Sequence, residues 1–348
     1  MRHFLRHATA GIECPALSNS SRIARFAVYA WLVLAFNVLV ILWGAVVRAT
    51  GSGAGCGDHW PLCNSHVIPP APAVATFIEF FHRLTSGLAL ILVVAMLFAA
   101  RRAFPPGHRA RHFAAAACAL IVVESAIGAF IVLQSLTGLN DSALRAVVIA
   151  VHQANTLLLL GAITLTAWAA TDEARPGARG RTRGPQLPHL RAMLVFGVVG
   201  LIVLSATGAI TALGDTLFPA DSLAESWQAK FSPTAHFLVR LRVVHPLIAG
   251  LMGLYVVVLA WLVHRRTNDA FTRWLASTLT GLFFAQCALG ALNVILLAPV
   301  WMQLAHLLLA DGVWIAFVLL AANAAAPHYR AASADHEAPV ASPALVVK

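Results

Sequence analysis

The chain has 348 residues, of which 59% are hydrophobic and only 11% are charged, and its formal net charge is +10. Soluble domains carry about a quarter charged residues, so this composition excludes an ordinary soluble protein and indicates a chain that mostly faces lipid or other helices. The positive charge is gathered between apolar segments rather than along one face, which argues against nucleic acid as a partner.

Eight apolar segments reach the roughly 20 residues needed to cross a bilayer. In chain order they cover about 26–48, 76–100, 112–134, 144–170, 191–212, 236–263, 272–297 and 300–323. The first segment is too long and lies too far from the start of the chain to be a cleaved signal peptide. We therefore predict an all-α integral membrane protein with eight transmembrane helices embedded in a lipid bilayer.

The placement of arginine predicts how these helices are oriented. Arginines gather before the first predicted helix and after the second, fourth and sixth, at Arg2, Arg6, Arg22, Arg25, Arg101, Arg102, Arg109, Arg111, Arg175, Arg179, Arg181, Arg183, Arg265, Arg266 and Arg273. The alternate loops carry acidic residues instead, at Asp58, Asp141, Asp215, Asp221 and Glu225. The positive-inside bias then predicts both termini in the cytoplasm of a bacterial cell, with the chain in its inner membrane.

The two halves of the sequence resemble each other. The segment "GAVVRATGSG" from Gly44 has a counterpart in "GAITALGD" from Gly208, and "ESAIGA" from Glu124 has one in "QCALGA" from Gln286. An even number of helices per half gives both halves the same orientation. We predict two pseudo-symmetric four-helix bundles, with an N-terminal half at 1–170, a cytoplasmic linker at 171–190, a C-terminal half at 191–323 and a disordered tail at 324–348.

Four histidines occupy repeat-related positions near the outer ends of the even-numbered helices. They are His82 and His152 in the first half, and His245 and His306 in the second. One histidine in a membrane helix is often only a polar group bonded to a neighbouring helix, but four in related positions indicate function. Two on different helices of each bundle suit axial ligation of a heme iron from both sides. Zinc is disfavoured because no further Cys, Asp or Glu nearby completes a tetrahedral site.

The two predicted heme sites differ in the residue three positions before the first histidine. Glu79 precedes His82, whereas Arg242 precedes His245, and residues three apart share a helix face. A carboxylate beside the iron suits proton transfer or charge stabilisation, so the first site is predicted to be catalytic. An arginine suits a heme propionate, which favours a permanently held electron-transfer heme in the second site. The alternative for Glu79 is a buried ion pair with Arg83.

These residues resemble the heme A synthase family, which converts heme O to heme A for cytochrome oxidase. The resemblance covers about 26–323 and rests on "GAVVRATGSGAGCGDHWPLCNS", "EFFHRLTSG", "VHQANT", "RVVHPLIAG" and "QLAHLLLADG". It implies stepwise oxidation of a ring methyl of heme O to a formyl group through an alcohol. It also implies heme O synthase (protoheme farnesyltransferase) and oxidase assembly factors as partners, and homo-oligomerisation is left open.

The resemblance also implies the site residues. Glu79, His82 and His152 would form the heme O substrate site, and His245 and His306 would bind the iron of heme B. Arg83 and Arg242 are candidates for contacts with heme propionates. In this family the equivalent loop cysteines form a disulfide, which implies that Cys56 and Cys63 are joined, either for redox exchange or as a structural staple.

Three other classes of protein compete with this interpretation. A di-heme cytochrome b that only transfers electrons commonly carries paired ligands about 14 residues apart on one helix, whereas each histidine here stands alone on its helix. A repeat-built transporter is expected to have spans interrupted near the midplane, and Pro246 is the only proline in the even-numbered helices. A membrane thiol oxidase leaves the four histidines unexplained.

Overall fold

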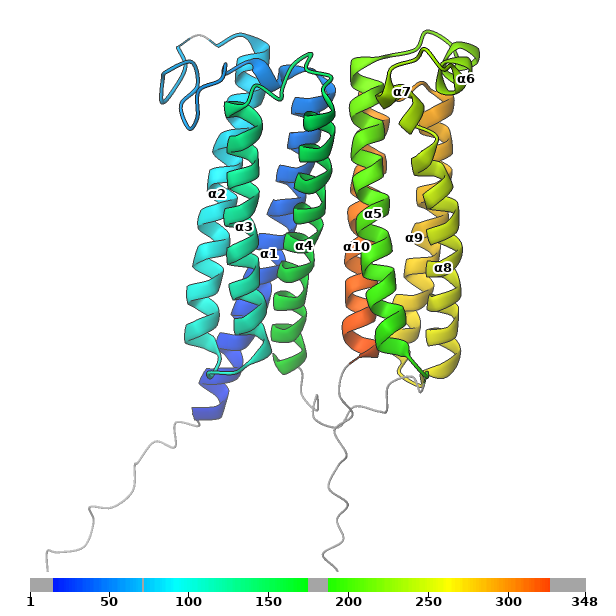
Figure 1. Ribbon diagram of the computed structural model, residues 1–348. Helices are drawn as coiled ribbons and strands as arrows, with labels where there is room; N and C mark the ends of the chain where they lie inside the picture. Colours follow the sequence, from blue (N-terminus) through cyan, green and yellow to red (C-terminus); the bar gives the residue numbers. More distant parts are fainter. Residues whose placement is uncertain (1–14, 71, 175–186, 326–348) are drawn as a thin grey trace, which may run out of the picture.

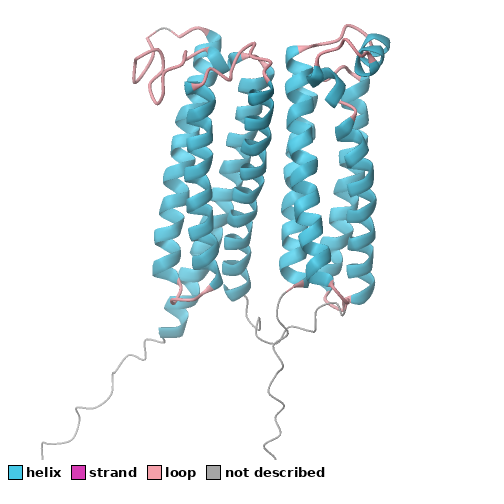
Figure 2. Cartoon of the chain, in the orientation of Figure 1, coloured by secondary structure: helices cyan, strands magenta, loops and turns pink. Residues whose placement is uncertain are grey.

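The computed structural model describes residues 15–70, 72–174 and 187–325, and within these ranges the chain forms helices and loops without a strand. Eight of the helical segments are long and apolar enough to cross a membrane. This confirms the predicted number of spans. Two groups of helices stand side by side, one from each half of the chain (Figure 1), with loops only at their ends (Figure 2).

The first group contains four spans. Its elements are α1 (Pro15–Ala49), the short 3-10 helix η1 (Ser52–Ala54), α2 (Val74–Ala103), α3 (Arg109–Leu133) and α4 (Ala143–Ala174). The N-terminus of α3 is capped by His108, whose Nδ1 accepts a hydrogen bond from the Ala110 amide at 3.1 Å. Burial lowers the pKa of this histidine, which favours the neutral ring that can accept.

The second group also contains four spans. Its elements are α5 (Leu190–Leu217), α6 (Leu223–Phe231), α7 (Phe237–Leu241), α8 (Val244–Arg266), α9 (Ala270–Ile295) and α10 (Val300–Ala324). The helix α4 runs on to Ala174, beyond the predicted end of its half. Most of the predicted linker (175–186), most of the predicted tail (326–348) and the first fourteen residues lie outside the described residues.

The sixth span differs from the single helix that the sequence predicts. It consists of α7 and α8, separated by a turn at Arg242 and Val243. Pro246 explains the break, because it has no amide hydrogen to donate to the carbonyl of Arg242 and its ring crowds that carbonyl. Proline is tolerated in the first turn of a helix, so a new helix begins at Val244 and His245 lies in its first turn.

The helix α6 is absent from the prediction, which treats residues 213–235 as an outer loop. Ser222 caps it, since its hydroxyl oxygen accepts a hydrogen bond from the Glu225 amide at 3.2 Å. The Glu225 carboxyl in turn accepts from the Asp221 amide at 2.9 Å. The serine followed three residues later by glutamate is a capping signature that the sequence contains, so this short helix was predictable.

The loops sort to the two ends of the molecule as the arginines predict. The loop with Cys56 and Cys63 lies at the same end as α6 and α7 (Figure 1). The short connections α2–α3 and α8–α9, with their arginines, lie at the opposite end, where α1 begins and α10 ends.

The helix α4 is the most buried span because it belongs to the first group but also contacts the second. It packs against α1 and α3 in its own group and against α5 and α10 in the other. Trp314 on α10 donates its indole N–H to the carbonyl of Leu157 on α4 at 2.8 Å. Gly161 lies beside this indole, and a Cβ atom there would be in ordinary van der Waals contact with the Trp314 ring at 3.4 Å. Small residues at such crossings let membrane helices approach closely.

Arg48 at the outer end of α1 joins the first half to the second. Its guanidinium donates to the Ala212 carbonyl at 2.7 Å and the Thr216 hydroxyl at 2.8 Å, both on α5. It also donates to the Gln303 side-chain oxygen on α10 at 2.9 Å. One half-buried side chain therefore ties three helices across the seam between the halves.

Replacing Arg48 with methionine, which keeps the side-chain length, is expected to destabilise the protein. A hydrogen bond from a charged donor contributes about 1.5–3 kcal/mol, so losing all three should lower the free energy of unfolding by at least about 2 kcal/mol. A thermal-shift measurement in detergent should show an earlier transition. The control is Arg240→Met, an exposed arginine at the same end of the molecule; equal transitions for the two variants would contradict the role given to Arg48.

Candidate functional site

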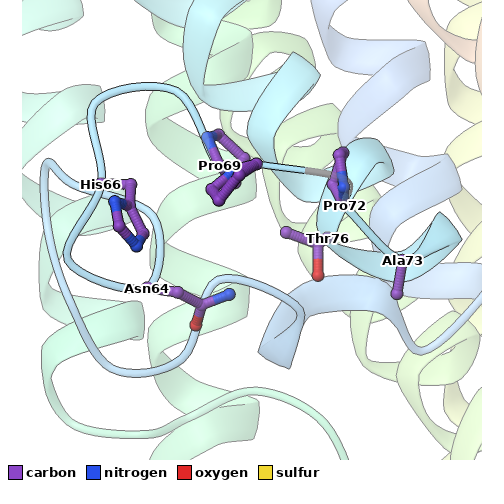
Figure 3. A pocket seen from close by; sticks show the side chains of 7 residues that line it. Asn64, His66, Pro69, Pro72, Ala73 and Thr76 are labelled. Carbon is purple, nitrogen blue, oxygen red and sulfur yellow. The ribbon is translucent and has the colours of Figure 1, made fainter.

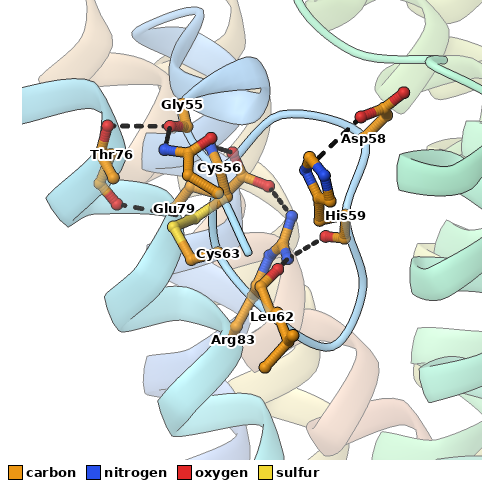
Figure 4. Close-up of polar contacts among 10 residues, drawn as sticks. Gly55, Cys56, Asp58, His59, Leu62, Cys63, Thr76, Glu79 and Arg83 are labelled. Atoms are coloured by element: carbon orange, nitrogen blue, oxygen red, sulfur yellow. Dashed lines mark hydrogen bonds and ion pairs between the residues drawn. A yellow bond between two sulfur atoms is a disulfide. The ribbon is translucent and has the colours of Figure 1, made fainter. Parts of the chain in front are cut away.

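The loop between α1 and α2 is closed by a disulfide and packed onto the start of α2. The sulfur atoms of Cys56 and Cys63 are bonded at 2.00 Å, and both residues are buried. The Thr76 hydroxyl on α2 donates to the Gly55 carbonyl at 2.8 Å (Figure 4). Gly55 allows this contact, because a Cβ atom there would lie 2.5 Å from the Ala75 carbonyl group. The loop is thus seated directly on the helix that carries His82.

Glu79 and Arg83 hold this loop from below (Figure 4). The carboxyl of Glu79 is 2.6 Å from an Arg83 guanidinium nitrogen, and its other oxygen accepts the Cys56 amide at 2.8 Å. Arg83 also donates to the carbonyls of His59 and Leu62, at 2.6 and 2.7 Å. The ion pair foreseen as the alternative role of Glu79 is present, and Glu79 is buried with only 3% of its surface exposed.

A pocket lies between the same loop and the N-terminus of α2 (Figure 3). Asn64, His66 and Thr76 supply its polar atoms, and prolines line much of the rest. Thr76 and Asn64 both donate to the Gly55 carbonyl, so two of these three polar side chains hold the loop.

In the second half the structure brings His245 and His306 together. Their ring centroids are 6.5 Å apart and their planes are nearly perpendicular, at 88°. Metal–imidazole bonds are about 2.0–2.1 Å long, so two rings on opposite sides of one metal have centroids roughly 6 Å apart. Nδ1 of His245 lies 3.2 Å from the Leu204 carbonyl and 3.3 Å from the Thr207 hydroxyl. Such contacts fix the ring and leave Nε2 to a metal.

His306 has a different neighbour. Its Nε2 lies 3.2 Å from the side-chain nitrogen of Gln286 on α9, while its Nδ1 is buried without a hydrogen-bond partner in the described chain. The two histidines come from α8 and α10 and are half-buried. The spacing of the two rings is close to that expected of two imidazoles on opposite sides of one heme iron.

In the first half, the two histidines are His82 on α2 and His152 on α4. Nδ1 of each ring is buried without a hydrogen-bond partner among the described residues. The Glu124 carboxyl on α3 is 3.5 Å from Nδ1 of His152. Sequence reasoning gave Glu124 no role, although a carboxyl group inside a predicted span was itself a signal.

Glycines on neighbouring helices make room for three of the four rings. A Cβ atom at Gly44 on α1 would lie 2.9 Å from Cε1 of His82, and one at Gly208 on α5 would lie 2.9 Å from Cε1 of His245. A Cβ atom at Gly290 on α9 would lie 3.0 Å from Cε1 of His306. Gly44 and Gly208, which begin one pair of repeated segments, therefore make room for a histidine ring in both halves. In the other pair only Gly290 does so, because a Cβ atom at its counterpart Gly128 would meet nothing within 4 Å.

The other residue singled out from sequence, Arg242, is also engaged by protein groups. It is buried, and its Nε lies 2.9 Å from the Asp215 carboxyl. One terminal nitrogen donates to the carbonyls of Gly214 and Phe218 at 2.7 and 2.6 Å. Arg242 thus fixes the outer end of α5 against the break before α8.

No group of three or more His, Cys, Asp or Glu side chains in the described ranges is arranged to hold a metal ion. The donor sets that do occur are two pairs of imidazoles at one end of the membrane spans. A heme suits them because the porphyrin itself supplies the other metal ligands, so that two axial imidazoles are sufficient.

Comparison with known proteins identifies a family whose model matches this chain and several proteins that are similar to it. The family model COX15-CtaA, described as a cytochrome oxidase assembly protein, matches residues 27–318. A protein of Geobacillus kaustophilus named "Heme A synthase" is 28% identical over 319 residues, which are 89% of this chain and 95% of that protein. A "Heme A synthase" of Symbiobacterium thermophilum is 29% identical over 289 residues, covering 80% and 89% of the two chains.

A third relative has a different name. A protein of Thermus thermophilus named "Protoheme IX farnesyltransferase" is 53% identical over 301 residues. These are 86% of this chain but 48% of that protein. The chain therefore spans about half the length of this relative, and the same holds for a protein of the same name from a second strain of Thermus thermophilus.

Replacing Gly208 with alanine is expected to displace His245 and weaken heme binding in the second half. The added methyl group would meet the ring at 2.9 Å, and disturbing the surroundings of a metal ligand typically lowers metal affinity by about tenfold or more. The low-spin heme absorbance of the purified protein should fall. Gly281→Ala is the control, because a Cβ atom there meets nothing within 4 Å; equal absorbance in both variants would contradict the placement of His245.

Proposed function

The chain belongs to the COX15-CtaA family of cytochrome oxidase assembly proteins, and we propose that it acts as a heme A synthase. In this proposal it oxidises a ring methyl group of heme O to a formyl group through an alcohol. It would hold heme O as substrate in the first half and heme B as the resident electron-transfer heme in the second.

The observation that carries the proposal is the match in extent. The chain aligns with 95% of a relative named heme A synthase, and the region matched by the family model includes all four histidines. The two imidazole pairs at one end of the spans supply the ligands for two hemes. A cytochrome that only transfers electrons is the alternative, and the relatives named heme A synthase favour the enzyme over it.

The name of the Thermus relatives raises farnesyl transfer as another activity. We assign that activity to the part of those proteins outside the alignment, because this chain corresponds to about half of each. The relatives instead support a heme O synthase as a working partner, together with cytochrome oxidase assembly factors.

Heme B, when bound, would supply an electron route away from the substrate. His245 and His306 would hold its iron, and the contacts of His245 with Leu204 and Thr207 would keep that ring in place. His82 and His152 would hold the iron of heme O and so set the plane of the substrate. Contacts at the edge of the ring, such as the proposed contact of Arg83 with a propionate, would then fix which ring methyl is oxidised.

Glu79 is proposed as the catalytic residue, accepting a proton or stabilising positive charge as the methyl group is oxidised. It lies one turn before His82, on the same helix face. Its contacts with Arg83 and the Cys56 amide fix its orientation. Arg83 and Arg242 are proposed to reach heme propionates. Nε of Arg83 has no hydrogen-bond partner in the described chain, whereas Arg242 would have to add this contact to those with Asp215, Gly214 and Phe218.

The protein is a multi-pass membrane protein, and we propose that its termini lie in the cytoplasm and its disulfide loop outside the inner membrane. Intact cells treated with a reductant should then expose Cys56 and Cys63 to an impermeant thiol reagent. Labelling that requires permeabilised membranes would reverse the orientation. A variant with serine at both positions controls for the remaining cysteines.

Co-expression with a heme O synthase is expected to yield heme A. Hemes extracted from the purified protein and separated by chromatography should include heme B together with heme O, its alcohol or heme A. An extract that contains heme B alone would favour the cytochrome alternative. Farnesylation of heme B without the partner enzyme would favour farnesyl transfer instead.

Glu79→Gln is expected to leave heme B content near that of the wild type and to lower heme A output by at least about tenfold, or ~1.4 kcal/mol of barrier. The amide keeps the hydrogen-bond acceptor for Cys56 but loses the charge, so chemistry should suffer more than binding. Heme O or its alcohol should accumulate. Thr76→Val loosens the same loop without touching the carboxyl group; an equal loss of heme A in this control would mean that Glu79 acts only by holding the loop.

A further inference from the structure

The carboxyl group of Glu124 on α3 is held by side chains on one face of α4. The Asn155 amide donates to one of its oxygens at 2.6 Å, and the Thr156 hydroxyl donates to the other. Its Oε1 is 3.5 Å from Nδ1 of His152. His152, Asn155 and Thr156 stand at positions i, i+3 and i+4, so all three project from the same side of α4. The carboxyl group therefore lies behind the histidine ring at a fixed position.

This carboxyl group places an acceptor 3.5 Å from a buried ring nitrogen. Nδ1 of His152 is shielded from solvent and has no hydrogen-bond partner among the described residues, and the Glu124 side chain is 17% exposed. The separation is longer than a hydrogen bond of about 2.7–3.2 Å, so the contact is electrostatic in this structure. A hydrogen on Nδ1 faces the negative oxygen favourably, and that tautomer leaves the Nε2 lone pair to a metal.

The second half has a different arrangement at the corresponding place. Gln286, the counterpart of Glu124, is uncharged and lies against Nε2 of His306 instead of Nδ1. Nothing equivalent to Asn155 and Thr156 holds it, because the positions three and four after His306 are Leu309 and Ala310. Its own side-chain oxygen has no hydrogen-bond partner in the described chain. One half thus places a held carboxyl group behind its histidine, and the other does not.

We infer that Glu124 is a positioning residue for His152, which fixes the tautomer of this ring and strengthens its electron donation to the iron of the bound substrate heme. The inference rests on the proposed function, in which His152 binds the iron of heme O. Carboxylates behind metal-binding histidines orient the ring and raise its basicity, and their loss typically lowers metal affinity or activity by about 10–100-fold. The substrate iron would therefore be more electron-rich than the resident iron, which has no such carboxylate.

A structural alternative is that Glu124 only ties α3 to α4. Asn155 already joins these helices, since its amide also donates to the Leu120 carbonyl at 3.0 Å. A tie between helices would affect stability but not the reduction potential of one heme. The two roles therefore differ in a measurable property that does not depend on turnover.

The test compares Glu124→Gln with the wild type, both purified after co-expression with a heme O synthase. We expect the variant to bind heme O about 10–100-fold more weakly and the reduction potential of its substrate heme to rise, with the potential of the resident heme unchanged. Redox titration followed by optical and electron paramagnetic resonance spectra separates the two hemes. Unchanged heme O affinity and potential would overturn the inference, whatever happens to heme A output.

Thr156→Val provides the matched second variant, and it also serves if Glu124→Gln does not fold. It removes one donor that holds the carboxyl group but keeps the charge, so a smaller rise of the same potential is expected. A loss of thermal stability in both variants with no change in potential would assign Glu124 to the structural alternative. If the wild type makes no heme A while the potential shift in Glu124→Gln is still seen, the proposed function fails and the positioning role stands.

Discussion

The arrangement of the protein depends on placing polar imidazole rings inside membrane spans that offer them few partners. Nδ1 is buried without a hydrogen-bond partner, among the described residues, in His82, His152 and His306. An unpaired buried polar atom costs about 1–3 kcal/mol, so a histidine with a purely structural role would be expected to meet an acceptor on the next helix. The rings of His82, His245 and His306 each lie beside a glycine of a neighbouring helix, which brings the helices close without binding the ring. Such an environment suits a ring whose main partner is a ligand.

The two halves close the outer ends of their helices by different means. The first half uses a disulfide loop that is anchored to α2 by Glu79 and Arg83. The second half uses α6 and α7, with Arg242 bound to Asp215. In each case an anchoring residue stands three positions before a histidine, so a displacement of the outer segment acts directly on the helix turn that carries the ring. From the sequence, the exchange of Glu79 for Arg242 was interpreted as a difference between the two heme sites. The two residues also hold different outer segments over the two pairs of histidines.

Hydrophobic length and arginine placement were enough to predict eight spans and the end at which each loop lies, because both follow from the energetics of the bilayer. The break before Val244 follows from Pro246, and the helix α6 follows from the cap of Ser222 and Glu225. Both signals are present in the sequence, but they are local and hydrophobic length does not reveal them. The contacts of Arg48 and Glu124 were beyond prediction. They depend on which helices face each other across the bundle, and one sequence read alone does not determine that.

The contact between the two halves explains why their similar sequences must differ at the residues that form this contact. Arg48 donates to the carbonyl of Ala212, which is its own counterpart at the repeat offset of 164 residues. An arginine at both positions would place two like charges side by side at the same end of a membrane bundle, where their repulsion is strong. The contact between the halves therefore requires an arginine in one half and an uncharged residue at the corresponding position of the other half. Glu124 and Gln286 are a second pair of corresponding positions at which only one half carries a charge. This second difference lies beside the histidines and not at the contact between the halves.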